Sequence, residues 1–130
     1  VPPIFGSRHE LDISDRLVKT TGVRPPNSRM LIGHLSGGNQ QKVVLAKWLT
    51  KLPKVLILNE PTRGMDVGAK REVLDLIKTL RAEGVAIILM STEPETVLAE
   101  SDRIFVLSKG QITAEFREGR VTKEALLVHA

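Results

Sequence analysis

Residues 35–41, Leu-Ser-Gly-Gly-Asn-Gln-Gln, place a hydroxyl and two glycines directly before a stretch with helical periodicity. A helix that begins there exposes unpaired backbone N–H groups and the positive end of its dipole, and both favour an anion such as phosphate. A simpler interpretation is also open, in which the hydroxyl of Ser36 only caps the helix. Taken alone, this segment does not decide between the two.

A second group of polar side chains follows an apolar run. Residues 55–58 are Val-Leu-Ile-Leu, and Asn59 and Glu60 come directly after them. Ligands of open α/β sheets collect at the carboxyl ends of the strands. A carboxylate at that position can orient an attacking water. The alternative is that Glu60 is simply the first solvated residue after a strand.

Both groups depend on a predicted order of strand, helix and strand. Residues 39–51 continue without a breaker and have one broad apolar face, which predicts a helix. The runs 55–58 and 85–90 are short and wholly apolar, as expected of strands buried on both faces. Between them, residues 68–83 have apolar side chains at helical spacing: Val73, Leu74, Ile77 and Leu80. This order predicts a parallel crossover unit and an α/β fold.

The flanking segments predict shorter elements. Residues 8–20 have approximate helical spacing, with Gly22 as a stop, while residues 1–6 indicate an extended lead-in or a cut edge. Pro94 suits the first position of a short helix that ends near residue 100. Two strands, 103–108 and 111–116, joined by a tight turn at Lys109 and Gly110, are expected to form the antiparallel edge of the sheet, and a terminal helix is expected over 122–129.

The composition excludes several classes of function. A chain of 130 residues has room for one modest core, since a domain of that size buries about two-thirds of its unfolded surface. The sequence has no cysteine, no apolar run close to the roughly 20 residues of a spanning helix, and no secretion signal at its start. The formal charge of +4 comes from scattered basic residues, and the single Trp and absent Tyr leave no stacking platform for nucleic acid. We therefore expect a soluble domain, or part of one, that does not bind nucleic acid.

Taken together, the motifs resemble one family. Residues 35–42 resemble the signature motif of ATP-binding cassette (ABC) transporters, and residues 56–62 resemble the Walker B strand with its catalytic glutamate. Residues 60–70 continue into what resembles the D-loop. Their sequence is similar to that of the second cassette of sugar importers that carry two cassettes in one polypeptide. The resemblance spans about residues 22–116. Two linked motifs at the right spacing are far more specific than a lone glycine pattern.

The resemblance implies a P-loop NTPase-like (RecA-like) fold, with a partial parallel sheet, flanking helices and an antiparallel C-terminal hairpin. Residues 1–34 would then be a lead-in and the end of the helical subdomain, and residues 35–130 the C-terminal half of the ATPase core. Such cassettes dimerise head to tail, so each ATP lies between one cassette's phosphate loop and the other's signature helix. Ser36, Gly38 and the helix start would face the γ-phosphate, and Gln40 and Gln41 would add donors.

Site residues carried over from the family fall into four sets. The signature set, which would bind nucleotide, is Leu35, Ser36, Gly37, Gly38, Asn39, Gln40 and Gln41. The Walker B set is Leu56, Ile57, Leu58, Asn59 and Glu60, with Glu60 as the catalytic residue that polarises water. The D-loop set is Gly64, Met65 and Asp66, with Asp66 crossing the dimer interface. Glu93 occupies the switch position.

The sequence departs from the family pattern at three places. Nothing matches Gly-x-x-x-x-Gly-Lys-[Ser/Thr], so we expect a fragment that lacks the phosphate loop and is inactive alone. Asn59 stands where an Asp would hold the Mg²⁺ shell, which predicts only weak metal binding there. Glu93 stands where a histidine would contact the γ-phosphate. Two like charges about 4 Å apart repel by about 4 kcal/mol at an effective dielectric of about 20, so Glu93 is expected only to favour the start of the following helix.

The resemblance implies an ATPase that couples ATP binding and hydrolysis to sugar import at the cytoplasmic face of the inner (plasma) membrane. Its cofactors would be ATP and Mg²⁺ in the full-length protein. Its partners would be a second cassette, transmembrane permease subunits and, indirectly, a sugar-binding protein. The three departures favour an asymmetric arrangement, in which this signature serves the partner's competent site while this cassette's own site is slow or silent.

Two other classes of function stay open at this point. Chromosome-organising and break-repair ATPases also carry a Ser-Gly-Gly signature, although residues 8–22 show no heptads of a coiled coil. Alternatively, the chain is a folded interaction module without enzymatic activity. The sequence does not indicate which sugar is carried or whether this cassette's own site hydrolyses ATP.

Overall fold

The computed structural model describes residues 8–117 and 121–130. The predicted lead-in at residues 1–6 lies outside them. The chain divides into two compact units: a helical unit, Val1–Lys54 with Thr62–Val85, and a sheet unit, Val55–Pro61 with Ala86–Ala130. The predicted boundary between residues 34 and 35 stays a prediction.

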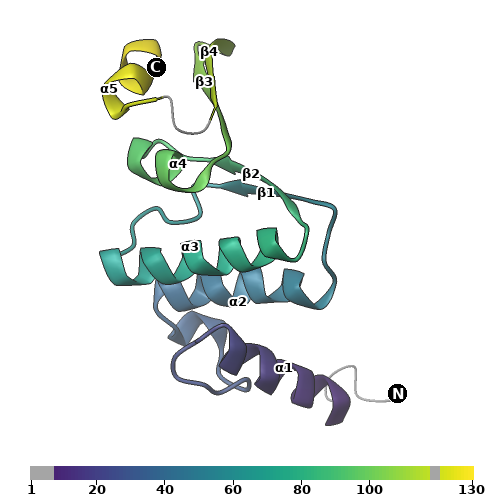
Figure 1. The fold of residues 1–130 in the computed structure, drawn as a ribbon. Coiled ribbons are helices and arrows are strands. Elements are labelled where there is room, and N and C mark those ends of the chain that lie inside the picture. Colours follow the sequence, from purple (N-terminus) through teal and green to yellow (C-terminus); the bar gives the residue numbers. More distant parts are fainter. Residues whose placement is uncertain (1–7, 118–120) are drawn as a thin grey trace. The chain divides into compact units, whose positions relative to one another are not determined.

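The helical unit contains α1 (Arg8–Thr20), a short 3₁₀ turn η1 (Ile32–His34), α2 (Gly37–Thr50) and α3 (Val67–Ala82). The helices α2 and α3 lie side by side (Figure 1). Leu45 of α2 is fully buried, and α3 buries a stripe with helical periodicity: Val73, Leu76, Ile77 and Leu80. The prediction included Leu74 in this stripe, but Leu74 is only half-buried and Leu76 lies in the core instead.

Close packing between α2 and α3 depends on a glycine. A Cβ atom built on Gly38 would lie 2.8 Å from the Cβ of Ala69, which is closer than real carbon atoms approach. Only glycine therefore fits at position 38 without a shift of one helix. Gly38 is buried for this reason, whereas the neighbouring Gly37 is exposed.

The sheet unit begins with β1 (Val55–Asn59) and β2 (Ala86–Met90), which pair in parallel with Ile57 opposite Ile88. The predicted strand, helix and strand order is confirmed. Next come α4 (Pro94–Glu100), with Pro94 in its first turn as predicted, and the strands β3 (Arg103–Ser108) and β4 (Gln111–Arg117).

The predicted hairpin of β3 and β4 is confirmed. Its two-residue turn places both Lys109 and Gly110 at positive φ, 50° and 78°, the combination that a type I′ turn needs. The terminal helix α5 (Lys123–His129) follows its N-cap residue Thr122, whose side chain accepts a hydrogen bond from the N–H of Ala125. One core cluster joins these elements through Ile104, Val106 and Leu126.

Two expectations about the strands are wrong. In β1, Leu56 and Leu58 are buried, but Val55 and Ile57 are 52% and 63% exposed, because side chains alternate along a strand and only one face is covered. The β3–β4 hairpin also forms a sheet of its own instead of the edge of β1–β2. The short turn pairs β3 with β4 directly. In the described part of the chain, no backbone hydrogen-bond ladder joins these two strands to β1 or β2.

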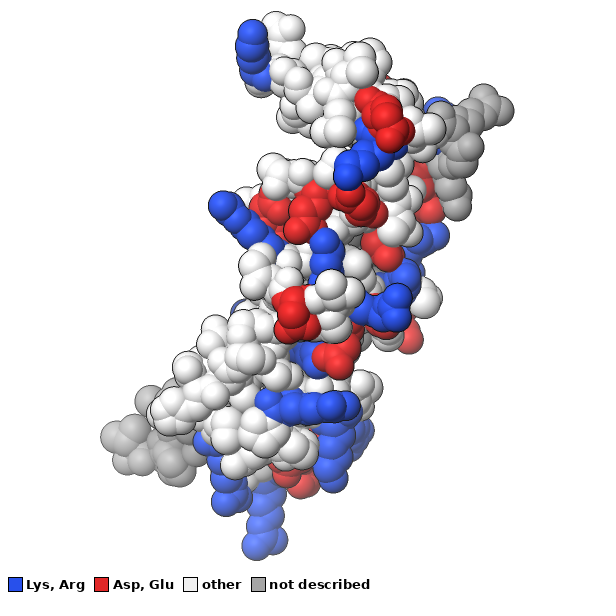
Figure 2. Space-filling view, turned by 90° about the vertical axis from the view of Figure 1, so that its left-hand side faces the viewer, with Lys and Arg blue, Asp and Glu red and all other residues white. Residues whose placement is uncertain are grey.

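Among residues 8–117 and 121–130, no helix has the length and apolar character needed to cross a bilayer. On the face shown in Figure 2, Lys and Arg side chains are interspersed with Asp and Glu. Charges of both signs therefore share that face.

Candidate functional site

Ser36 directly precedes α2, but its side chain does not cap the helix. Its backbone is extended, with φ −61° and ψ 155°, and its side chain makes no capping hydrogen bond. Instead, its Oγ accepts a hydrogen bond of 2.9 Å from Nδ2 of Asn39, while its carbonyl accepts the N–H of Gln40. The simple capping interpretation of Ser36 is therefore wrong.

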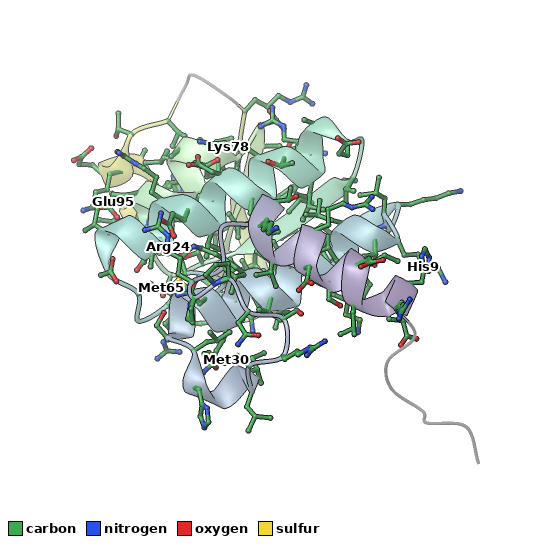
Figure 3. The ribbon with its side chains drawn as sticks, turned by 90° about the horizontal axis from the view of Figure 1, so that it is seen from below. His9, Arg24, Met30, Met65, Lys78 and Glu95 are labelled. Atoms are coloured by element: carbon green, nitrogen blue, oxygen red, sulfur yellow. The ribbon has the colours of Figure 1, made fainter. Side chains whose placement is uncertain are left out.

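The other signature side chains hold the turn that leads into α2. Oδ1 of Asn39 accepts the backbone N–H of Arg24 at 2.9 Å, and Nε2 of Gln40 donates to the carbonyl of Leu35 at 2.9 Å. Arg24 lies in the loop that follows α1 (Figure 3). The amide of Gln40 therefore binds within the chain, whereas Gln41 is half-buried.

Gly37 leaves an open approach to the helix start. It is exposed, and a Cβ atom built on it would meet nothing within 4 Å. Packing among the described residues therefore does not require glycine at this position. The missing side chain instead leaves the first-turn N–H groups accessible to a ligand that comes close to the backbone.

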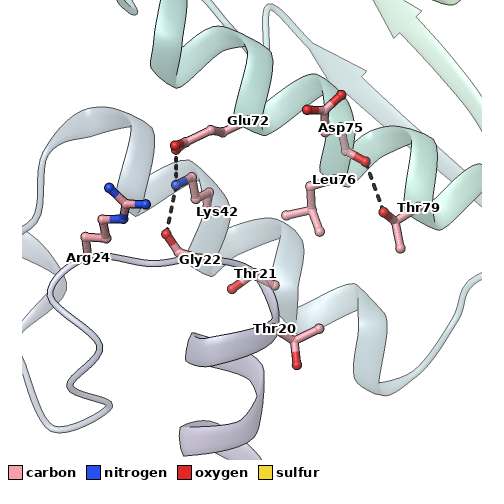
Figure 4. A pocket seen from close by; sticks show the side chains of 9 residues that line it. All are labelled: Thr20, Thr21, Gly22, Arg24, Lys42, Glu72, Asp75, Leu76 and Thr79. Carbon is pink, nitrogen blue, oxygen red and sulfur yellow. Dashed lines mark hydrogen bonds and ion pairs between the residues drawn. The ribbon is translucent and has the colours of Figure 1, made fainter.

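Lys42 was missed by the sequence analysis. Its side chain is only 3% exposed, its Nζ donates to the carbonyl of Gly22 at 3.0 Å, and it forms an ion pair with Glu72 of α3 (Figure 4). The hydrogen bond and positive charge of Lys42 lower the pKa of the Glu72 carboxyl. The helical spacing of Lys42 with Leu45 and Ala46, which are also buried, is the signal that could have revealed it.

A pocket of about 270 Å³ lies beside this ion pair. Its lining mixes hydroxyls with charges of both signs: Thr20, Thr21, Gly22, Arg24, Lys42, Glu72, Asp75, Leu76 and Thr79. Figure 4 shows the Lys42 ammonium between Glu72 and the Gly22 carbonyl. The pocket thus adjoins the contacts that join α2 to the loop after α1.

The D-loop residues lie at the start of α3. Asp66 is exposed, and its Oδ1 caps the helix by accepting the N–H of Ala69 at 2.9 Å. Gly64 adopts a positive φ of 72°, and the N–H of Met65 donates to the carbonyl of Thr62. In the described part of the chain, Oγ1 of Thr62 is buried without a hydrogen-bond partner. The capping role of Asp66 is a local function that the sequence analysis did not assign.

Glu60 lies at the tip of β1 in a fixed orientation. Its Oε1 accepts the backbone N–H of Thr92 at 2.8 Å, and its Oε2 accepts the hydroxyl of Ser91 at 3.3 Å. Its own N–H donates to the carbonyl of Met90 at 2.9 Å. Its φ of 48° is left-handed, a conformation that costs a non-glycine residue roughly 1–2 kcal/mol.

Glu93, at the switch position, binds to the helix that follows it. It occupies the residue before α4, and its Oε2 accepts the hydroxyl of the buried Thr96 at 3.0 Å. Its N–H donates to Oγ of Ser91 at 3.1 Å, so Ser91 contacts both Glu60 and Glu93. Ser91 and Thr92 were missed, although parallel strands that end at one edge bring their following residues together.

The described residues do not form a magnesium site by themselves. Asn59 is exposed at the end of β1 and offers one neutral carbonyl oxygen. Within 8–117 and 121–130, no three His, Cys, Asp or Glu side chains gather closely enough to hold a metal ion. A magnesium ion, which prefers several oxygen ligands in octahedral geometry, would need groups from outside these residues.

The site residues thus form two local groups. The signature residues and the D-loop lie in the helical unit, whereas the Walker B residues and Glu93 lie in the sheet unit. Within each unit, hydrogen bonds fix the polar side chains. The first group contains the accessible start of α2, and the second contains the carboxylate of Glu60, whose direction is fixed by hydrogen bonds.

Known proteins resemble this chain in sequence. Residues 8–63 match the family model described as ABC transporter. The xylose import ATP-binding protein XylG of Geobacillus kaustophilus (strain HTA426) is 46% identical over 124 residues, which cover 94% of this chain and 25% of that relative. The ribose import ATP-binding protein RbsA of Bacillus subtilis (strain 168) is 46% identical over 127 residues, which cover 98% and 26%. The chain therefore spans about a quarter of the length of these curated relatives.

A solved structure, a nucleotide-free ATP-binding cassette from an ABC transporter, has the same fold. Its TM-score is 0.80 over 97% of this chain and 49% of that chain, with 23% sequence identity. The predicted P-loop NTPase-like fold class is confirmed. These matches and the motifs described above show that the chain belongs to the ABC transporter family and forms part of one of its ATP-binding cassettes.

Proposed function

We propose that this chain contributes a signature helix and a Walker B glutamate to an ATPase that drives sugar import. The chain spans about a quarter of relatives whose names describe xylose and ribose import. We assign it to the second cassette of a two-cassette polypeptide. That polypeptide would lie on the cytoplasmic face of the membrane with permease subunits and, indirectly, a sugar-binding protein.

The observation that carries the proposal is the open start of α2. Ser36 and Gly37 are exposed, the Ser36 hydroxyl caps nothing, and no side chain at position 37 blocks the backbone. Such a helix start stabilises negative charge through its N–H groups and dipole. The γ-phosphate of ATP is the anion that this geometry suits in a cassette.

The phosphate loop must come from outside this sequence. The pattern Gly-x-x-x-x-Gly-Lys-[Ser/Thr] occurs nowhere in the 130 residues, so the chain by itself lacks the lysine that neutralises the phosphates. We propose that a second cassette holds that nucleotide and that Ser36 and Gly38 approach its γ-phosphate. In such a dimer, Asp66 would reach the interface from the start of α3.

Glu60 has the properties of a residue that orients water. The N–H of Thr92 and the hydroxyl of Ser91 fix the direction of its carboxylate. A fixed carboxylate at a strand end can accept a proton from an attacking water in one direction only. We assign Glu60 this role toward the nucleotide of its own cassette.

The same cassette's site would be slow or silent. Asn59 supplies a neutral oxygen where a carboxylate would support magnesium, and Glu93 is bound to Thr96 at the start of α4. A charge-assisted hydrogen bond contributes about 1.5–3 kcal/mol, against about 1 kcal/mol for a neutral one. We therefore propose that this chain's signature serves the partner's site, where most of the ATP turnover takes place.

The test uses the full polypeptide, assembled with its permease and binding protein in liposomes. ATP-driven uptake of labelled ribose and xylose is measured with the release of phosphate. We expect uptake of at least one sugar, and loss of both activities in Ser36→Arg, because the long cation fills the space of the phosphate. Ser28→Arg is the matched control, since Ser28 lies in the same unit and its hydroxyl donates to Asp15. Sugar import is contradicted if ATP is hydrolysed without uptake of either sugar, and the role of Ser36 if Ser36→Arg turns over ATP normally.

A further inference from the structure

The side chain of Asn39 joins Ser36 to the loop after α1. Its Oδ1 accepts the backbone N–H of Arg24 and its Nδ2 donates to Oγ of Ser36, both at 2.9 Å. We propose that Asn39 is a positioning residue that turns the hydroxyl proton of Ser36 toward the phosphate. This inference rests on the proposed function. It names the groups that orient the Ser36 hydroxyl at the start of α2.

The orientation of the Asn39 amide follows from its partner. A backbone N–H can only donate, so the atom that faces Arg24 has to be the carbonyl oxygen of the amide. The NH₂ group then faces Ser36, where it needs an acceptor. The oxygen of Ser36 supplies that acceptor.

This contact leaves the hydroxyl proton of Ser36 available. A serine hydroxyl has one donor and two acceptor lone pairs, and Asn39 uses a lone pair. Within residues 8–117 and 121–130, no acceptor binds that proton. Ser36 is exposed, so the proton can donate to an oxygen that arrives from outside the chain. A phosphate oxygen makes such a hydrogen bond charge-assisted and therefore strong.

The loop that holds Asn39 is itself fixed to α2. The carbonyl of Gly22 accepts Nζ of Lys42 at 3.0 Å, and Lys42 is also paired with Glu72. Asn39 and Lys42 are three residues apart, so they lie on the same face of the helix. The loop at Gly22 and Arg24 is therefore bound at two points of one helix face, which keeps the Arg24 N–H directed at Asn39.

A double-mutant cycle in the assembled full polypeptide tests the inference. ATP hydrolysis is measured over a range of MgATP concentrations for Ser36→Ala, Asn39→Ala and the double variant. We expect each single variant to lower kcat/KM by about 10- to 100-fold and the double variant to be no worse than Ser36→Ala, because Asn39 acts through Ser36. Asn27→Ala is the control, since the side chain of Asn27 accepts the N–H of Arg29 in the same loop, and it should leave kcat/KM unchanged.

A second variant distinguishes the loss of the contact with Ser36 from a general loss of structure. Asn39→Asp keeps an oxygen for the Arg24 N–H but cannot donate to Ser36, so the loop stays bound while the Ser36 hydroxyl turns inward. We expect a loss of kcat/KM at least as large as that of Asn39→Ala, since the added carboxylate also repels the phosphate, with an unchanged thermal midpoint. Losses of Ser36→Ala and Asn39→Ala that multiply in their double variant would overturn the inference and leave the function standing. An unchanged kcat/KM in Ser36→Ala would instead remove the proposed role of Ser36.

Discussion

The carboxylate of Glu60 accepts the backbone N–H of Thr92 at 2.8 Å, which ties the end of β1 to the segment after β2. The two residues are 32 positions apart in the chain. Ser91 adds a second contact to the same carboxylate and also accepts the N–H of Glu93. The direction of the proposed catalytic group is thus set by the residues that precede the switch position.

Ser91→Ala should loosen this arrangement. The substitution removes a charge-assisted hydrogen bond to Glu60, worth about 1.5–3 kcal/mol, and a neutral one from the N–H of Glu93, worth about 1 kcal/mol. We expect the 130-residue chain to lose about 2–4 kcal/mol of unfolding free energy, measured by urea denaturation. Ser91→Thr keeps the hydroxyl and is expected to lose much less. Equal losses in the two variants would mean that the hydroxyl has no part in the effect.

Glu93→His should have little effect on ATP turnover in the full polypeptide. The side chain of Glu93 binds Thr96 at the start of α4, and the asymmetric arrangement that we propose assigns most turnover to the partner's site. We expect phosphate release within about twofold of the unchanged protein, while Ser36→Arg abolishes it. A large gain of phosphate release in Glu93→His would contradict this expectation. It would mean that Glu93 alone keeps the site silent.

The Lys42–Glu72 pair should make stability depend on pH in the acidic range. Lys42 lowers the pKa of Glu72 below its ordinary value of 4.5, so the folded state holds the carboxyl ionised more strongly than the unfolded state does. The resulting stabilisation is complete above the unfolded pKa and is lost as the pH falls through the folded pKa. Unfolding free energy, measured from pH 7 down to pH 3, should fall in this window.

Lys42→Met should remove that part of the pH dependence. Methionine fills the buried volume but cannot donate to Gly22 or pair with Glu72, so the pKa of Glu72 returns toward its ordinary value. Loss of this charge-assisted hydrogen bond to the Gly22 carbonyl should cost about 1.5–3 kcal/mol at pH 7. Lys47→Met, on the exposed side of the same helix, is the control. An unchanged acidic slope in Lys42→Met would show that the pair does not contribute to it.

Two neighbouring glycines should respond in opposite ways to alanine. Gly38→Ala places a carbon 2.8 Å from the Cβ of Ala69, so α2 and α3 have to separate, at a cost of about 1–3 kcal/mol. Gly37→Ala meets nothing within 4 Å and should stabilise the chain by about 0.5–1 kcal/mol. Thermal unfolding measures both changes.

The same pair separates packing from ligand binding. In the full polypeptide, Gly37→Ala should lower ATP turnover although it stabilises the chain, because the added methyl obstructs the approach of phosphate to the helix start. Turnover that stays normal in Gly37→Ala would argue against a close approach at this position.

The sequence by itself determined the local elements and the family motifs. Helical periodicity predicted α2 and α3, Pro94 marked the start of α4, and the Lys109-Gly110 turn predicted the hairpin, because these features depend on neighbours a few residues apart. The segment at 35–41 and Glu60 were also recognisable from residue types and order alone.

Only the tertiary structure decided what these residues contact. Hydrogen bonds and an ion pair join residues that no local pattern relates. They join Glu60 to Ser91 and Thr92, Asn39 to Arg24, and Lys42 to Glu72. The exposed face of β1 likewise depends on which surfaces are covered, and an apolar run of four residues looks the same whether one face or both are buried. Hydrogen-bond partners and burial arise from packing between distant segments, so they are properties of the folded chain and not of its local sequence.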